Sequence, residues 1–204
     1  ETRLALVDGG AAGLAFASGQ SAITAALQTI CHVGQNFVSA TSLYGGTWTL
    51  FTQTFKNMGV EVRFFDPNHP EEIHDLVDEN TRCVYFESIG NPKNDVPDFK
   101  KITEIAHEHG LPALCDNTVM TPALLRPIEH GVDIVISAED AAGIPEDAWP
   151  GYHGAGTYHA TFGQDFVSDE SFQAKATGGA IDVSAMTEAQ KRAALAELQR
   201  SLGT

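Results

Sequence analysis

The stretch that decides the fold is Leu111-Pro-Ala-Leu-Cys-Asp-Asn-Thr-Val-Met-Thr-Pro122, in which an apolar run stops abruptly at three polar residues. The run predicts a buried strand, and open α/β sheets build ligand sites where polar groups follow the carboxyl ends of strands. Asp116 is the first of these polar residues. A buried acid needs a cationic partner or hydrogen bonds, so Asp116 either meets a cation, such as a protonated ring nitrogen, or caps the following turn.

Around this stretch, strands alternate with helices up to about residue 138. Short runs of β-branched and aromatic residues predict strands at 36–40, 61–65, 83–87, 113–115 and 133–137. Apolar residues at helical spacing predict helices at 1–8, 21–30, 47–58, 71–77, 99–109 and 124–130. Repeated strand–helix units of this length indicate an α/β fold with a mostly parallel sheet flanked by helices.

The alternation stops near residue 138, which suggests two regions. We expect residues 1–138 to form a ligand-binding α/β domain and residues 139–204 to be a loop-rich remainder that ends in a helix at 187–202. His153 and His159 lie in a glycine-rich part of that remainder without a third ligand, so no metal site is expected.

Composition narrows the class of partner. The chain of 204 residues has a net charge of −15, with 27 acids against 12 lysines and arginines. Binding to nucleic acid or to an anionic membrane needs clustered positive charge, so neither partner is expected. The three cysteines lack CxxC spacing, and no apolar run reaches the length of a membrane span. Reduced thiols and the absence of an apolar leader favour a cytoplasmic protein.

Several polar residues lie at predicted strand ends, where parallel sheets collect ligands. Ser18-Gly19-Gln20 precedes a helix, whose free N–H groups can hold a phosphate, although Ser18 can equally be an ordinary cap. Tyr44 stands before two glycines and can stack on a flat ring, or it can be a half-buried loop aromatic. The segment 87–91, Asp116 and Ser137 occupy comparable positions.

Five motifs then occur in a specific order. They are Ser18-Gly-Gln, Ser42-Leu-Tyr-Gly-Gly-Thr47, Glu87-Ser-Ile-Gly-Asn-Pro92, Asp116-Asn-Thr118 and Arg126-Pro-Ile-Glu-His-Gly-Val-Asp-Ile-Val135. Together they resemble the cysteine and methionine metabolism family of pyridoxal-phosphate-dependent enzymes, and their wording is closest to the O-acetylhomoserine sulfhydrylase members. The resemblance covers roughly residues 1–138.

The resemblance implies the large domain of a fold-type-I enzyme that binds pyridoxal 5'-phosphate. The residues implied to bind the cofactor are Gly19, Gln20, Tyr44, Asn91, Asp116, Thr118 and Ser137. Backbone N–H groups of Gly19 and Gln20, together with the Ser137 hydroxyl, would hold the phosphate. Tyr44 would stack on the pyridine ring and Asp116 would keep its nitrogen protonated, which makes these two the expected catalytic residues. Asn91 and Thr118 would lie beside the ring.

The resemblance also implies a reaction. Family members of this type replace the acetyl group of O-acetyl-L-homoserine with sulfide or methanethiol, which gives homocysteine or methionine plus acetate. A related γ-lyase or a cystathionine γ-synthase is the alternative. The implied partners are a small amino-acid substrate and further copies of the chain, as a homodimer or homotetramer.

The chain departs from the family after Ala138. The pattern requires Thr-Lys there, the lysine being the one that forms the Schiff base, but the chain has Glu139-Asp140. One hypothesis is that segments are omitted, including this lysine, an amino-terminal segment and a carboxyl-terminal domain. This hypothesis predicts a break in the backbone between Ala138 and Glu139, and another between about 167 and 179.

Two alternatives to omitted segments stay open. The chain can be an inactive relative, or a structural subunit, that binds pyridoxal phosphate without a covalent link. It can also be a different α/β enzyme that uses the same strand ends for another phosphate ligand.

Overall fold

The computed structural model describes residues 1–139 and 157–162, and the structural statements below concern these residues. Their strands form one seven-stranded sheet with the order β1-β7-β6-β5-β4-β2-β3. The strands are β1 (Ala12–Phe16), β2 (Asn36–Ala40), β3 (Glu61–Phe65), β4 (Thr81–Glu87), β5 (Ala113–Asp116), β6 (Ile134–Glu139) and β7 (Thr157–Phe162).

The sheet is mostly parallel. Neighbouring strands from β2 to β6 pair in parallel. β7 lies between β1 and β6 and is antiparallel to both, so it alone runs against the direction of the other described strands. The expected fold class is therefore confirmed. Five of the strands were expected from the sequence with small differences in their ends, whereas β1 and β7 were not.

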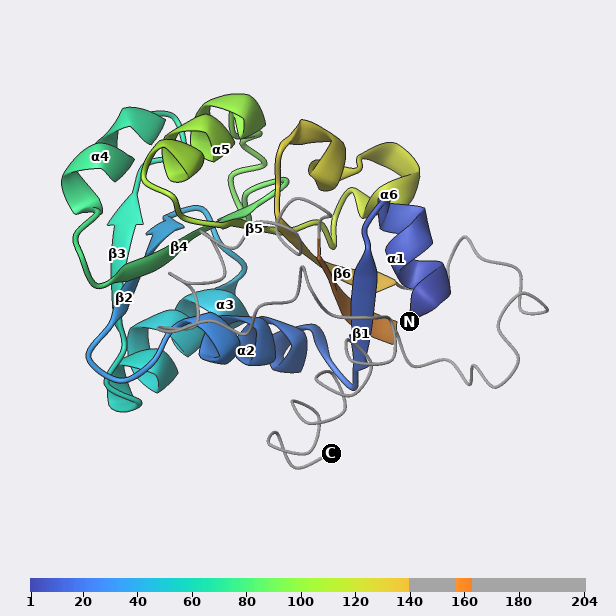
Figure 1. The fold of residues 1–204 in the computed structure, drawn as a ribbon, viewed down its shortest axis with the longest axis horizontal. Coiled ribbons are helices and arrows are strands. Elements are labelled where there is room, and N and C mark those ends of the chain that lie inside the picture. Colours follow the sequence, from blue (N-terminus) through green and yellow to red (C-terminus); the bar gives the residue numbers. More distant parts are fainter. Residues whose placement is uncertain (140–156, 163–204) are drawn as a thin grey trace, which may run out of the picture.

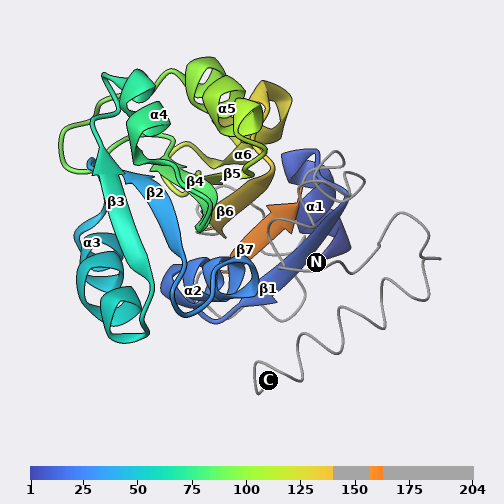
Figure 2. The same cartoon turned by 60° about the vertical axis from the view of Figure 1, so that its left-hand side comes forward.

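Helices cover both faces of the sheet (Figures 1 and 2). The α-helices are α1 (Thr2–Asp8), α2 (Gly19–Ile30), α3 (Gly45–Thr49), α4 (Ile73–Leu76), α5 (Phe99–Glu108) and α6 (Thr121–Leu124). A π-helix, η1 (Leu50–Phe55), continues α3, and two 3₁₀ turns are η2 (Pro70–Glu72) and η3 (Pro127–His130). In Figure 1, α2 and α3 lie below the sheet, while α4 and α5 lie above it.

Alternation along the central strands divides the core into two halves. Tyr85 and Leu114 pack with α2 and η1, whereas their neighbours Phe86 and Cys115 pack with α5 on the other face. Because side chains alternate between faces along a strand, Glu87 and Asp116 belong to the α2 face. All three cysteines are buried free thiols, as expected.

Some expected boundaries were wrong. The helix expected at 47–58 begins at Gly45 and becomes a π-helix at Leu50. The helix expected at 124–130 is instead two short turns, one before Leu125 and one from Pro127. Proline at the start of each accounts for the division, since its ring cannot continue a preceding helix.

The region beyond residue 138 also differs from expectation. β6 runs through Ala138 to Glu139, so the break expected between these residues is wrong. β7, which falls within the 139–204 remainder, joins the same sheet as residues 1–138. The second expected break, the terminal helix and His153 lie outside the described residues. Among the described helices, none has the length and hydropathy needed to cross a membrane.

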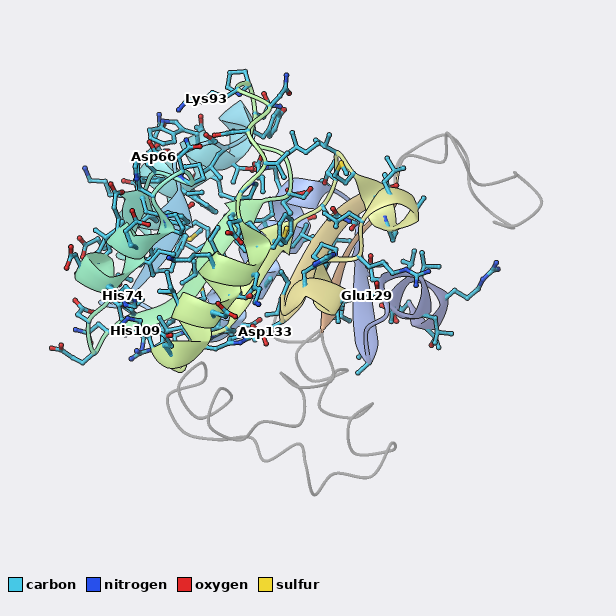
Figure 3. All side chains as sticks on the ribbon, turned by 90° about the horizontal axis from the view of Figure 1, so that it is seen from above. Asp66, His74, Lys93, His109, Glu129 and Asp133 are labelled. Carbon is cyan, nitrogen blue, oxygen red and sulfur yellow. The ribbon has the colours of Figure 1, made fainter. Side chains whose placement is uncertain are left out.

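Figure 3 looks onto the layer of α4 and α5 and separates the two ends of the sheet. Asp66 and Lys93 follow the carboxyl ends of β3 and β4, and they lie at one edge of the picture. His109 and Asp133 precede β5 and β6, and they lie at the opposite edge. The candidate residues from the sequence are at the carboxyl end.

Candidate functional site

Two acidic side chains lie next to each other at the carboxyl end of the sheet. Glu87 ends β4 and Asp116 ends β5, and the two residues are direct partners in the parallel register of these strands. Glu87 is only 6% exposed and Asp116 is partly buried. Both face the α2 side of the sheet, so the strands bring two carboxyl groups into one small region.

Burial makes ionisation of this pair unfavourable. It raises the pKa of Glu87 to about 8, with Asp116 and Asp95 adding to the rise and the Tyr44 N–H opposing it. Burial likewise raises the pKa of Asp116, and the hydrogen bonds from Thr118 oppose that rise. Within the described residues, neither acid forms an ion pair. A cation placed here would therefore gain a strong electrostatic partner.

The phenol of Tyr85 points toward the same region. Its side chain is fully buried on β4, two residues before Glu87, and its hydroxyl makes no hydrogen bond of good geometry with the described residues. Burial raises its pKa well above the ordinary value, and the Asp116 and Glu87 carboxylates raise it further. Asp116 and Thr47 lie near enough to influence this hydroxyl, so Tyr85 belongs to the same polar cluster.

Tyr44 lies at the entrance to the acidic pair. It is the residue before α3, and its backbone N–H donates to Oε1 of Glu87 at 2.8 Å. Its ring is 54% exposed and lies against Gly46, where an added Cβ would come within 2.5 Å of Cε1 of the ring. Glycine at position 46 is therefore needed for this ring position. More than half of Tyr44 is exposed, as stacking on a ligand requires.

The amino end of α2 provides backbone donors on the same side of the sheet. The Ser18 hydroxyl accepts from the Ser21 N–H at 3.1 Å, and the Ser21 hydroxyl accepts from the Ser18 N–H, which is a capping box. Gly19 and Gln20 are the first two helical residues, and N–H groups at these positions have no acceptor within the helix. Ser18 can therefore cap the helix while the N–H groups of Gly19 and Gln20 remain available to a phosphate.

A side-chain contact connects α2 to the Tyr44 segment. Nε2 of Gln20 donates to Oγ1 of Thr47 at 3.2 Å, and Thr47 is completely buried. This contact brings the segments around Gln20 and Tyr44 together, although they are far apart in sequence. The structure therefore brings Gln20, Tyr44 and Asp116 to one end of the sheet.

Asp116 also makes the local turn that was the alternative hypothesis. Its Oδ1 accepts from the Thr118 N–H at 2.9 Å, and the Thr118 side chain is exposed. Asn117 is fully buried and donates from Nδ2 to the Leu125 carbonyl at 2.8 Å. The turn uses Oδ1 of Asp116, and the carboxyl group forms no ion pair within the described residues, so a cationic ligand can still pair with it.

Two expected residues are not joined to this cluster by a hydrogen bond. Asn91 is exposed in the loop after β4. Ser137 is 1% exposed on β6, and its hydroxyl has no partner among the described residues. By strand alternation Ser137 falls on the face opposite Ile136, whose side chain packs in the α2 half of the core. Their roles stay predictions.

The structure adds two residues that the motifs did not mark as functional. Sequence analysis placed Glu87 at a strand end but gave it no role, and it treated Tyr85 only as part of a strand. A signal was present, because Tyr85 and Glu87 are polar residues at alternate positions of an otherwise apolar strand. That spacing predicts one common face of the sheet.

The site is built for an organic cation with an anionic group. Among the described residues, no cluster of three metal-ligating side chains occurs. Asp116, an accessible aromatic ring and a helix amino end suit a flat, positively charged heterocycle that carries a phosphate. Fold and site together define a class of α/β enzyme domain that binds its ligand at the carboxyl end of a parallel sheet.

Comparison with known proteins identifies the family. The family model for Cys/Met metabolism PLP-dependent enzymes matches residues 1–140, which is more than half of the chain. The chain belongs to this family, whose members are enzymes that depend on pyridoxal phosphate (PLP). The resemblance inferred from the five motifs is thereby confirmed.

Individual relatives agree with that assignment. The chain is 46% identical over 155 residues to a homocysteine/cysteine synthase of Saccharomyces cerevisiae, which covers 76% of this chain and 33% of the yeast protein. It is 44% identical over 136 residues to an O-acetyl-L-homoserine sulfhydrylase of Leptospira meyeri, covering 67% of this chain and 31% of that protein. The chain spans about a third of the length of the curated relatives it matches.

A solved structure shows the same fold. An O-acetylhomoserine (thiol)-lyase from Campylobacter jejuni superposes with a TM-score of 0.80 at 32% identity, covering 99% of this chain and 50% of that one. That structure contains N'-pyridoxyl-lysine-5'-monophosphate. In the chain described here β6 ends at Glu139, where the family resemblance requires threonine before the lysine. The cradle residues fit the cofactor, whereas the covalent link has no lysine at the corresponding place.

Proposed function

We propose that this chain forms the cofactor domain of an enzyme that carries out γ-replacement on O-acetyl-L-homoserine. Sulfide or methanethiol is the incoming group, homocysteine or methionine is the product, and acetate leaves. The names of the yeast and Leptospira relatives support this reaction. The length of the match, about a third of each relative, means that other parts of such a protein would complete the substrate site.

The observation that carries the proposal is the unpaired acid at the centre of the site. Asp116 has a pKa raised by burial and forms no ion pair within the described residues. A protonated pyridine nitrogen would reverse that penalty, since an opposite charge favours the carboxylate. The bound cofactor supplies an electron sink, which is deepest with a protonated ring. Asp116 holds that proton at the nitrogen.

The remaining cradle residues orient the cofactor. The N–H groups at the start of α2 suit its phosphate, because the amino end of a helix carries partial positive charge. The exposed Tyr44 ring suits its pyridine face. Gln20 ties these two segments together through Thr47, so the distance between phosphate and ring positions is held by a direct contact.

A second candidate function has its own supporting observation. β6 continues as a strand through Ala138 and ends at an acid instead of the expected Thr-Lys. A cradle without that lysine would bind pyridoxal phosphate non-covalently, as an inactive relative or a structural partner of a complete subunit. The two candidates share Asp116, Tyr44 and the α2 amino end, and they differ only in the covalent link.

Reduction with borohydride separates the candidates. The purified chain is incubated with pyridoxal phosphate, reduced and analysed by intact mass and peptide mapping. A pyridoxyl group on one specific lysine, together with homocysteine formed from O-acetyl-L-homoserine and sulfide, supports the enzyme. Saturable binding without attachment supports the non-covalent relative. Release of a 2-oxo acid and ammonia instead would favour the γ-lyase. No saturable binding at all would contradict both.

We also propose that the chain assembles into a homodimer or homotetramer. Support comes from the family resemblance, in which a neighbouring subunit completes the phosphate site, and from large apolar side chains that are exposed in the described part. These include Leu6 at 70%, Val33 at 80% and Leu124 at 75%. Contacts between copies of the chain would remove such side chains from water. Sedimentation velocity at micromolar concentrations tests this, and a single monomeric species would contradict it.

The proposed location is the cytoplasm. Cys31, Cys83 and Cys115 are free thiols in the structure, and reduced cysteines suit a reducing compartment. Fractionation of cells that express the chain with a small epitope tag would test this location.

A further inference from the structure

We propose that Glu87 is a positioning residue whose carboxyl group, through the backbone of Tyr44, holds the Tyr44 ring at the entrance to the site. The inference rests on the proposed function in one respect, namely that the ligand on which the Tyr44 ring stacks is the cofactor. It assigns a role to a buried acid that does not itself touch the cofactor in this scheme. Asp116 retains the role of partner to the ring nitrogen.

The contact is well suited to fix a loop. Tyr44 precedes the first turn of α3, where backbone N–H groups have no helical acceptor, and no side chain caps this helix end. Glu87 supplies the missing acceptor at 2.8 Å, across 43 residues of sequence. Because Glu87 is 6% exposed and sits at the end of a central strand, the acceptor itself cannot move freely. The loop is thereby attached to the end of a central strand.

The other contacts of this loop act on the neighbouring residues or on the Tyr44 carbonyl, which accepts from the Trp48 N–H at 2.9 Å in the first turn of α3. The Ser42 hydroxyl donates to Oδ2 of Asp95 at 2.7 Å, and Thr47 accepts from Gln20. Gly46 leaves room for the ring, yet it does not hold the ring in place. The Glu87 bond is therefore the one side-chain contact among those described that acts on the Tyr44 backbone.

The protonation state of Glu87 affects the charge of the site. The groups that face it are Asp116 on β5, Asp95 in the loop after β4, and the Tyr85 phenol on the same face of β4. None of these is a cation. With its pKa raised to about 8 by burial, Glu87 is a neutral acid at pH 7. It then accepts the Tyr44 N–H through its carbonyl oxygen without adding a second negative charge next to Asp116.

The first experiment needs no cofactor. In ¹⁵N-labelled protein, the amide shifts of Tyr44 are followed from pH 6 to pH 10. We expect them to titrate with a midpoint near pH 8, because ionisation of Glu87 strengthens its bond to this N–H. The titration should be absent in Glu87→Gln and unchanged in Glu108→Gln, an exposed glutamate at the end of α5. The proposal is overturned if the Tyr44 amide shift of the parent does not change with pH, or if its titration persists in Glu87→Gln.

The second experiment measures pyridoxal phosphate binding at pH 7 by fluorescence. Glu87→Gln, which keeps an acceptor, should bind within about threefold of the parent. Glu87→Ala should bind roughly tenfold more weakly, a difference of about 1.4 kcal/mol. If Glu87 acts through Tyr44, the double variant with Tyr44→Ala should bind no more weakly than Tyr44→Ala alone. Additive losses, or parent-like binding by Glu87→Ala, would contradict the positioning role.

The two experiments keep this inference separate from the proposed function. If the parent chain binds no pyridoxal phosphate, the proposed function fails, while the Tyr44 titration still decides whether Glu87 holds the loop. If Glu87→Ala does not fold, Glu87→Gln and the titration decide instead. If the parent binds and the titration is absent, the positioning role fails and the cofactor site stands.

Discussion

The two ends of the sheet treat buried acids in opposite ways. At the amino end, Oδ2 of Asp133 accepts from the Ala113 N–H at 2.7 Å and contacts Nε2 of His107 at 2.9 Å. At the carboxyl end, Glu87 accepts one backbone N–H and lies beside a second acid. Both are carboxyl groups. One oxygen of Asp133 has two partners, whereas the Glu87 carboxyl accepts a single hydrogen bond.

A second acid at the amino end makes the contrast quantitative. Asp78 accepts from Nδ2 of Asn36 at 2.9 Å, from the Asn80 N–H at 2.8 Å, and pairs with Arg63 at 2.8 Å. These bonds, led by that from Asn36, lower its pKa, whereas burial raises the pKa of Glu87 to about 8. In this structure Asp133 and Asp78 each have several donors, whereas Glu87 has one. Such perturbed pairs are a physical marker of a site.

The largest expected effect concerns stability and pH. The folded pKa of Glu87 is raised to about 8 from its ordinary value of 4.5, so the folded state retains a proton that the unfolded state loses in this window. The free energy of unfolding should therefore fall as pH rises from about 4.5 to 8 and level off above 8. Glu87→Gln should remove this loss and be more stable than the parent by roughly 3–5 kcal/mol at pH 8.

Urea unfolding at pH 4, 6 and 8 measures this difference. At pH 4 both states of the parent are protonated at Glu87, so the advantage of Glu87→Gln should vanish there. Glu108→Gln serves as a matched control, because it removes an exposed carboxylate and should follow the parent at each pH. An advantage that does not change with pH would mean that Glu87 ionises normally, and the contrast between the two ends would lose its main support.

The next effect concerns Asp116. Asp116→Asn keeps the shape of the side chain and removes the charge that would pair with the ring nitrogen. Loss of a charge-assisted bond is worth about 1.5–3 kcal/mol, so pyridoxal phosphate binding should weaken by roughly 10- to 150-fold. Asp66→Asn, which changes a partly buried acid after β3 at the same end of the sheet, is the control and should bind as the parent does. Equal binding by all three proteins would remove Asp116 from the site.

Much of the fold could be predicted because its strands carry their own pattern. β2 and β3 were predicted with their observed bounds, since both are short β-branched and aromatic runs that end at turns. β1 was missed because Ala12-Gly-Leu-Ala-Phe16 is rich in alanine and glycine, which have low strand propensity. Its position comes from pairing with β7, far along the chain, in the register Ala12 with Phe162.

The site was predicted only in part. Asp116 and Tyr44 lie at or after strand ends and also belong to the motifs, so two independent signals marked them as site residues. Glu87 was not given a role because its significance depends on two contacts between distant parts of the chain, the register with Asp116 and the bond from Tyr44. A sequence pattern shows which residues end strands, whereas the order of the strands decides which of those ends are neighbours.

A third prediction tests the amino end of the sheet. Asp133→Ala should leave the buried Ala113 N–H without an acceptor and should lower the free energy of unfolding by about 1–3 kcal/mol. Because Asp133 lies at the opposite end of the sheet from Asp116, the folded variant should bind pyridoxal phosphate as the parent does. Urea unfolding and a binding isotherm on the same sample measure both quantities. A loss of affinity without a loss of stability would show that the two ends are coupled.

The smallest expected effect compares two helix caps. The Ser18 hydroxyl caps α2 by accepting from Ser21, and the Asp98 carboxylate caps α5 by accepting from the Lys101 N–H at 3.0 Å. Replacing either cap with alanine should cost about 1 kcal/mol of stability. Only Ser18→Ala should also weaken pyridoxal phosphate binding, by roughly two- to fivefold, because fraying of the first turn displaces the N–H groups proposed to hold the phosphate.

Asp98→Ala is the matched control for this comparison, since it removes a cap of the same type from a helix on the other face of the sheet. Binding at several phosphate concentrations sharpens the test, because free phosphate should compete with the cofactor in the parent and less effectively in Ser18→Ala. If both cap variants lose stability and neither loses affinity, the amino end of α2 does not hold the phosphate. The carboxyl-end site would then be reduced to Asp116 and Tyr44, which contact the ring, with Glu87 holding Tyr44 in position.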